Sequence, residues 1–148
     1  MARRVFFSFH YQRDIWRVNQ IRSLPNIIDT AAAGFIDASL WEEAKSKGDA
    51  TVQKMIDDAL VGTTVTVVMI GEKSANRKFI NYEITQSIAR GNGIVGVQIH
   101  HLKNHSGETD SVGATPAKLT SGSYPIYKYV DSAKLATWIE ATAIAAGR

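Results

Sequence analysis

The stretch that decides the fold is "TVTVVMIG", residues 64–71. Its apolar residues occupy both alternating sets of positions: Val65, Val67, Val68, Met69 and Ile70. An apolar run without alternation, rich in β-branched residues, is typical of a strand that is covered on both faces. Sheets covered on both faces are built mainly from parallel strands joined by crossover helices. The stretch therefore predicts an α/β protein.

Helical patterns flank this strand on both sides, as a crossover arrangement requires. In "DATVQKMIDDALVG", residues 49–62, the apolar side chains follow the i, i+3, i+4, i+7, i+8 spacing of one helix face. Asp49 is a possible cap of this helix and Gly62 a stop signal. The segment "KFINYEITQSIARG", residues 78–91, predicts a second helix that ends at Gly91.

The same criteria predict the remaining elements. Strands are expected at 4–9, 32–37, 93–99 and 124–130, and helices at 13–24 and 131–147. In the 13–24 segment the charged residues Arg13, Asp14 and Arg17 stand between the apolar positions. The residues of the closing helix that we expect to face inward are Leu135, Trp138, Ile139, Thr142 and Ala146. The prediction is a flavodoxin-like three-layer α/β/α fold with a largely parallel five-stranded sheet, in one domain spanning residues 1–148.

Composition excludes several classes of function. The 148 residues contain no cysteine, which rules out disulfides, thiolate metal sites and a cysteine nucleophile. The net charge of +3 comes from scattered basic residues, so we expect no nucleic-acid surface. No apolar run is long enough for a membrane span, and we expect a cytoplasmic protein. There is no P-loop or G-x-S-x-G motif.

Polar and aromatic residues follow the first three predicted strands, where parallel sheets bind their ligands. These residues are Ser8, Phe9, His10 and Tyr11 after the first strand, Asp37, Ser39 and Trp41 after the second, and Ser74, Asn76 and Arg77 after the third. Such a mixture suits a polar ligand that carries rings. Structural roles remain open for several of them: His10 and Tyr11 as strand and helix caps, Asp37 as a turn cap, and Trp41 as a cover of the core.

Glu83 is the one acidic residue inside the apolar face of the 78–91 helix. On a helical wheel it shares half of the circumference with Phe79, Ile80, Ile84, Ser87 and Ile88. Removing an unpaired charge from water costs several kcal/mol. Glu83 is therefore either paired with an arginine such as Arg13 or Arg77, or kept for chemistry on a ligand.

Two further segments need an interpretation. His100, His101 and His105 form a histidine-rich group, but we expect a loop without metal because adjacent residues of a strand point to opposite sides. The polar connection between residues 100 and 123 is long for an ordinary loop. It is a functional lid, a partner surface or a mobile excursion.

Three ordered stretches carry a resemblance to a known family: "RVFFSFHYQRD" (4–14), "DASLWE" (37–42) and "SANRKFINYEI" (74–84). The first resembles the first strand and loop of Toll/interleukin-1 receptor (TIR) domains. The third is similar to their third-helix motif, in which an aromatic residue precedes a glutamate by four positions. The residues of the three stretches are most similar to those of the TIR-like ThsB proteins of bacterial Thoeris anti-phage defence. The likeness runs from about Arg3 to His101, and Phe79 and Ile80 replace the Trp-Cys pair common in TIR domains.

The resemblance implies a flavodoxin-like fold and cleavage of NAD, as substrate and not as cofactor, at the nicotinamide–ribose bond. ThsB-like members are expected to make a cyclic ADP-ribose isomer or a related nucleotide signal that activates a partner effector. Glu83 matches the catalytic glutamate of the family. The residues Phe9, His10 and Tyr11 match the loop that lines the nucleotide pocket, and Asp37 to Trp41 match the loop used for ligand contact and self-association.

Two other functions remain open at this point. One is a non-catalytic interaction or sensor module, in which Glu83 is held in an ion pair. The other is an enzyme similar to nucleoside deoxyribosyltransferases, which also use a glutamate at a glycosidic bond.

Overall fold

The computed structural model describes residues 3–22 and 45–148, and in this part of the chain four parallel strands form one sheet. The strands are β1 (Val5–Ser8), β2 (Val65–Ile70), β3 (Gly93–Gln98) and β4 (Ile126–Lys128), and they lie side by side in that order. Val5 pairs with Val65, and Val65 pairs with Gly93. The predicted parallel α/β sheet is confirmed, whereas the strand expected at 32–37 lies outside the described residues.

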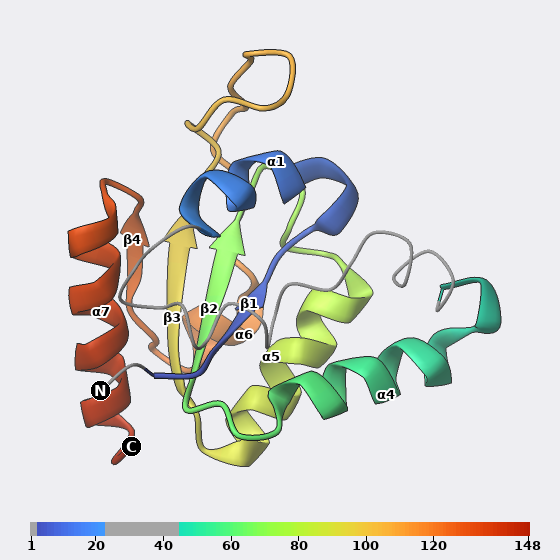
Figure 1. Cartoon of the computed structure of the whole chain (residues 1–148), viewed down its shortest axis with the longest axis vertical. Coiled ribbons are helices and arrows are strands. Elements are labelled where there is room, and N and C mark those ends of the chain that lie inside the picture. The colour runs from blue at the N-terminus through green and yellow to red at the C-terminus, as the bar shows by residue number, and fades with distance from the viewer. Residues whose placement is uncertain (1–2, 23–44) are drawn as a thin grey trace.

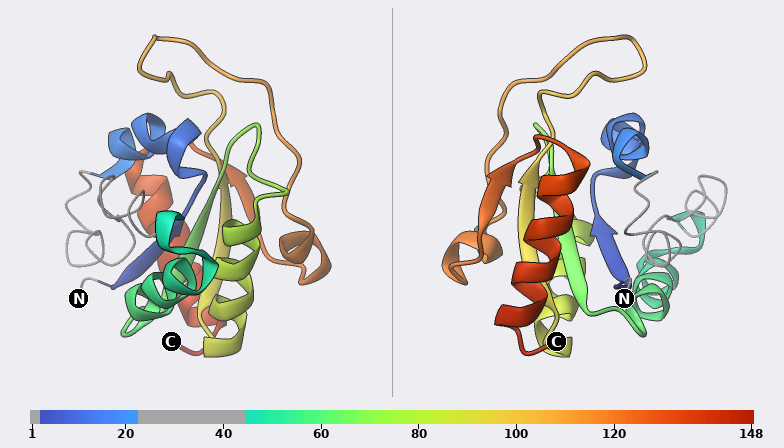
Figure 2. Two further views of the ribbon diagram at one scale, coloured as in Figure 1. Left: turned by 90° about the vertical axis from the view of Figure 1, so that its right-hand side faces the viewer. Right: turned by 60° about the vertical axis from the view of Figure 1, so that its left-hand side comes forward.

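Helices cover both faces of this sheet and give it three layers (Figures 1 and 2). They are α1 (Tyr11–Arg22), α4 (Asp49–Leu60), α5 (Lys78–Arg90), the short α6 (Ala117–Ser121) and α7 (Ser132–Ala145). Among the described helices, none has the length and the apolar character needed to cross a membrane. The three-layer prediction is confirmed, and α6 is an element that the sequence pattern did not predict.

The side chains of β2 alternate between two cores, as a strand covered on both faces should. Val65, Val67 and Met69 pack in a cluster with buried residues of α1 and α7. Val68 and Ile70 point the other way and pack with buried residues of α5. All six residues of β2 are buried. The stretch that predicted the fold therefore lies at the centre of the sheet.

The two helices that flank β2 in the sequence lie where their patterns predicted, with one correction at α4. The helix buries Val52, Ile56 and Leu60, but Asp49 does not cap it. Gly48 occupies the capping position, and the Asp49 carboxylate instead accepts a hydrogen bond from the Lys78 ammonium at 2.5 Å. The charge of Asp49 is thus used to connect α4 with the start of α5.

The closing helix and its neighbouring strand differ from prediction at their ends. Leu135, Ile139 and Thr142 are buried as expected, but Ala146 is exposed because α7 ends at Ala145, and Ala143 is buried instead. The predicted 124–130 strand is shortened to Ile126–Lys128. Sheet and helix pack closely here: a Cβ added at Gly93 would lie 2.5 Å from the Thr142 carbonyl oxygen, so only glycine fits.

A row of buried polar side chains fixes α5 against β2. The hydroxyl of Ser87 donates to the Glu83 carbonyl at 2.7 Å, and the Thr66 and Ser87 hydroxyls lie 2.7 Å apart. Since Ser87 has already used its proton, Thr66 is the donor in that pair. Asn92 donates in turn to Thr66 and Thr63. These directional contacts set how far along the sheet each residue of α5 lies.

Candidate functional site

Glu83 faces the carboxyl end of β1 from the second turn of α5. It is only 7% exposed, and Ser8, the last residue of β1, is fully buried. The Ser8 hydroxyl donates a hydrogen bond to the Glu83 Oε1 atom at 3.2 Å. The sequence-based prediction that this carboxyl group lies inside the apolar face of the helix is confirmed.

No positively charged side chain in residues 3–22 and 45–148 lies within ion-pair distance of Glu83. Of the two arginines considered as partners, Arg13 pairs with Glu72 at 2.8 Å and with Asp110 at 3.2 Å. Arg77 makes no ion pair with any described residue. The interpretation of Glu83 as half of a structural ion pair is therefore unsupported by the described part of the chain.

Burial raises the pKa of Glu83 well above the ordinary value of a glutamate, and the hydrogen bond from Ser8 lowers this pKa in part. The cause is the loss of water around the charged form, which no cation of residues 3–22 and 45–148 replaces. An ionised Glu83 would therefore interact strongly with a positive charge that develops beside it, because little solvent is present to screen it.

A polar pocket of about 680 Å³ lies at the carboxyl edge of the sheet, next to the loop after β1. The loop after β2, the start of α1 and the β3–α6 connection also contribute to it. Its described walls are formed by His10, Arg13, Glu72, Lys73, Ala75, Asn76, Arg77 and Ala114. Three basic side chains face one carboxylate, so the pocket favours an anionic ligand. Its volume lies within the range of about 300–1,000 Å³ that is typical of small-molecule sites.

His10 is the wall residue of this pocket that lies nearest in sequence to Ser8. It lines the pocket and stands two residues after Ser8, the hydrogen-bond partner of Glu83. Burial lowers the pKa of His10, and the neighbouring charges of Arg77 and Arg13 lower it further. The imidazole is therefore neutral at pH 7 and offers one donor and one acceptor. Glu83 itself is not one of the lining residues.

The other predicted site residues separate into three groups. Asn76 and Arg77 line the pocket. The Ser74 hydroxyl is instead buried and accepts a hydrogen bond from the Gly71 amide at 2.9 Å, which holds the turn after β2. Phe9 packs in the core cluster between α1 and α7. The predictions for Asp37, Ser39, Trp41 and the Tyr11 side chain lie outside the described residues.

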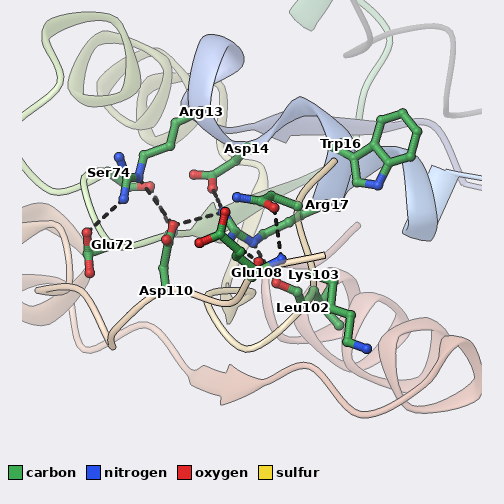
Figure 3. Close-up of polar contacts among 12 residues, drawn as sticks. Arg13, Asp14, Trp16, Arg17, Glu72, Ser74, Leu102, Lys103, Glu108 and Asp110 are labelled. Atoms are coloured by element: carbon green, nitrogen blue, oxygen red, sulfur yellow. Dashed lines mark hydrogen bonds and ion pairs between the residues drawn. The ribbon is translucent and has the colours of Figure 1, made fainter. Parts of the chain in front are cut away.

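Sequence reasoning missed a group of buried charges on α1 (Figure 3). Asp14 and Arg17 are 0% and 1% exposed, although they were expected between the apolar positions of this helix. They form an ion pair at 2.9 Å, and Arg17 also pairs with Asp110 at 2.9 Å. The signal was present, because Asp14, Arg17, Val18 and Ile21 have the i, i+3, i+4, i+7 spacing of one helix face.

The comparison with protein families identifies the chain. The model of the family described as "Thoeris protein ThsB, TIR-like domain" matches residues 6–104. The chain belongs to the ThsB TIR-like family. The matched segment of this TIR-like chain includes β1 from Phe6 onward, the Ser8–Glu83 contact, β2, α5 and β3. It ends inside the β3–α6 connection, so α6, β4 and α7 lie beyond it.

A curated relative of this ThsB-family chain comes from Bacillus cereus (strain MSX-D12) and is named "Putative cyclic ADP-D-ribose synthase ThsB1". The two proteins are 45% identical over 118 residues, which is 78% of this chain and 62% of the relative. The chain thus spans less than two thirds of the length of the relative. The flavodoxin-like fold that the TIR resemblance implied agrees with the parallel sheet and its two helix layers.

The buried carboxyl group of this TIR-like chain should make stability depend on pH. Because folding raises the pKa of Glu83, its contribution to stability is complete below its ordinary pKa, near 4.5, and is lost as the pH rises through the raised value. The Glu83→Gln variant lacks this titration, so the parent should lose stability relative to the variant as the pH rises from 4.5 through the raised pKa of Glu83. Urea denaturation across that range measures the difference.

The control for this prediction is Glu140→Gln, which changes an exposed carboxylate in the same way. The hydrogen bond from Arg3 lowers the pKa of Glu140, so the stability difference between the parent and this control should change with pH in the opposite direction. The change should be small, because the pair is exposed to water. A stability difference between the parent and Glu83→Gln that stays constant from pH 4.5 to 9 would show that Glu83 titrates normally.

Proposed function

We propose that this chain cleaves NAD at the bond between nicotinamide and ribose and releases a cyclic ADP-ribose isomer or a related nucleotide signal. The observation that carries the proposal is the Glu83 carboxyl group, which is buried at the ligand edge of the sheet, 3.2 Å from Ser8 and with no counter-ion among the described residues. Family membership and the printed name of the Bacillus cereus relative support the same activity.

The chemistry needs one well-placed carboxylate. Nicotinamide leaves NAD as a neutral ring from a cationic one, so the leaving group needs no proton. The ribose passes through an oxocarbenium-like state with positive charge near the anomeric carbon, as in glycoside hydrolysis. Ionised Glu83 would stabilise that charge, and its buried surroundings would strengthen the attraction. The same carboxylate can accept hydrogen bonds from the ribose hydroxyls.

The pocket beside His10 has the charge that a dinucleotide requires. NAD carries a negatively charged diphosphate, and the pocket walls include Arg77 and Lys73, neither of which is paired with a described carboxylate. Arg13 is the third basic wall residue, but its charge is balanced by Glu72 and Asp110. We assign the diphosphate to Arg77 and Lys73, with neutral His10 available to a sugar hydroxyl or a base edge.

The attacking atom determines the product. If water attacks the ribose after nicotinamide has left, the product is ADP-ribose. If a hydroxyl of the same nucleotide attacks, the new bond closes a ring and the hydroxyl releases its proton. If a ring nitrogen attacks, its lone pair forms the new bond and the positive charge passes from the ribose to the base. Cyclisation therefore needs a folded substrate in a site from which water is excluded. The released nucleotide would then act on a partner effector, which it reaches by diffusion.

The direct test is incubation of the purified chain with NAD, followed by mass spectrometry of the products. The proposal predicts free nicotinamide and a nucleotide lighter than ADP-ribose by one water molecule. Because a TIR-like site can be completed by a second subunit, the assay should be repeated at high protein concentration and with extract of phage-infected cells. Intact NAD under all of these conditions would refute the proposal and favour the non-catalytic module.

A further inference from the structure

The connection between β3 and α6 is an ordered strap across the ligand edge of the sheet; we use "strap" for residues 100–114 (Figures 1 and 2). The Asp110 amide donates to the His100 carbonyl at 2.9 Å, and this contact brings the two ends of the excursion together. At its tip, the Asn104 side chain accepts from the amides of Ser106 and Glu108. The strap has its own turn structure.

The side chain of Arg17 holds the base of the strap against α1 (Figure 3). Its guanidinium donates to the Leu102 carbonyl at 2.7 Å, to the Glu108 carbonyl at 3.2 Å and to the Asp110 carboxylate at 2.9 Å. Two of these acceptors are backbone atoms on opposite arms of the strap. Only the planar fork of an arginine presents donors in the directions that these acceptors require.

The strap also touches the pocket, and the contacts run through Asp110 and Glu72. Asp110 pairs with Arg13 as well as with Arg17. Glu72 accepts from Arg13 at 2.8 Å and from the Ser111 amide at 3.0 Å. Arg13, Glu72 and Ala114 are all walls of the pocket. One side of the pocket is therefore attached to the strap that Arg17 holds.

The backbone of the strap lies against the end of β2 without space for a side chain. A Cβ added at Gly113 would lie 2.2 Å from the Gly71 carbonyl oxygen. A Cβ added at Gly71 would lie 2.2 Å from the Asp14 carboxylate. The strap, the loop after β2 and α1 thus meet in one packed layer, so a displacement of the strap moves the pocket wall.

We infer that Arg17 is a positioning residue that sets the affinity of the pocket for a dinucleotide, by holding the strap in the place that orients Arg13, Glu72 and Ala114. Arg17 does not itself line the pocket. The inference rests on the proposed function only in its choice of ligand. We use "clamp" for the three contacts of Arg17 with the strap. Weakening the clamp should weaken the binding of NAD. It should leave the bond-breaking step, which we assign to Glu83 and Ser8, largely unchanged.

Two variants weaken the clamp without creating a large cavity. Asp110→Asn removes the negative charge that pairs with both Arg13 and Arg17. Arg17→Lys keeps the positive charge at this position of α1 but lacks the planar guanidinium group. Glu140→Gln is the matched control, because it removes a carboxylate from an arginine pair with Arg3, far from the strap. Steady-state kinetics with NAD, the Kd for ADP-ribose and hydrogen exchange of the strap amides are measured for all three.

For both clamp variants we expect faster exchange in residues 100–114, a KM for NAD and a Kd for ADP-ribose raised by roughly tenfold, and a kcat within about twofold of the parent. Glu140→Gln should change none of these. Faster exchange with unchanged KM and Kd would show that the strap does not shape the pocket, and unchanged exchange would show that Arg17 does not hold it. Either result overturns the inference.

The failure of the proposed function gives a different pattern. If the parent binds ADP-ribose without cleaving NAD, the proposed reaction is refuted, and the Kd values still test the inference. If the parent binds neither nucleotide, both are refuted.

Discussion

The Glu83→Gln variant is expected to lose cleavage of NAD by at least about 100-fold in kcat, while it still binds the dinucleotide. Glutamine has nearly the same shape and retains a carbonyl oxygen that can accept the hydrogen bond from Ser8. It lacks the negative charge that would stabilise the ribose cation. Single-turnover release of nicotinamide, followed by chromatography, measures the loss.

Two further variants test whether the position of the Glu83 carboxylate matters in addition to its charge. Glu83→Asp keeps the charge but shortens the side chain, and a misplacement of about 1 Å in a preorganised site can cost on the order of 100-fold. Glu140→Gln makes the same change of acid to amide on the exposed face of α7 and should leave the activity unchanged. Turnover by Glu83→Gln close to that of the parent would remove Glu83 from the mechanism.

The pH profile of the parent provides an independent readout of the same group. The proposed reaction requires the ionised carboxylate, and burial raises the pKa of Glu83. The kcat/KM for NAD should therefore rise with pH through the raised pKa, on the alkaline side of an ordinary glutamate.

The Arg17→Met variant is expected to lose about 3–5 kcal/mol of folding stability at neutral pH. The Asp14 Oδ1 atom is held by Arg17 at 2.9 Å, and its buried Oδ2 atom has no hydrogen-bond partner among the described residues. Without Arg17 the carboxylate would stay buried with no positive charge in contact. Urea denaturation followed by circular dichroism measures the change, and a loss below about 1 kcal/mol would contradict the prediction.

The pH and a second substitution identify the cause of that loss. Burial raises the pKa of Asp14, and Arg17 lowers it, so Arg17→Met should raise this pKa further. The loss should then shrink as the pH falls, because protonated Asp14 carries no charge to compensate. Asp14→Asn combined with Arg17→Met should recover part of the stability. Lys54→Met, which breaks an exposed pair with Asp58, should cost less than about 1 kcal/mol.

The sequence alone was sufficient for those features in which one residue type dominates a regular pattern. The strand at Val65–Ile70 is apolar at both alternating sets of positions, and α4 repeats apolar residues at helical spacing, so burial and secondary structure point to the same answer. Glu83 was found because it breaks such a pattern. A single charge inside a regular apolar face is visible from the spacing alone.

The features that were missed depend on partners far away in the sequence. Arg17 is buried because its acceptors are Leu102, Glu108 and Asp110, more than 80 residues later, and no local pattern reveals them. Helix spacing could have shown that Arg17 shares a face with Val18, but a charge there is normally interpreted as exposed. Phe9 was assigned to the pocket by its place after the first strand and by likeness to a motif, whereas the structure packs it in the core.

The hydroxyl and amide contacts between β2 and α5 have a consequence for how a protein of this kind can diversify. The Thr66–Ser87 contact holds Glu83 at the level of Ser8, and neither Thr66 nor Ser87 is among the residues that line the pocket. The walls of the pocket, in which we propose that the diphosphate binds, come from other residues, most of them in the loop after β2. Under the proposed function, reaction and recognition therefore depend on separate sets of residues, and exchanges in the pocket walls are expected to change which nucleotide is bound while the Glu83 carboxyl group stays in place.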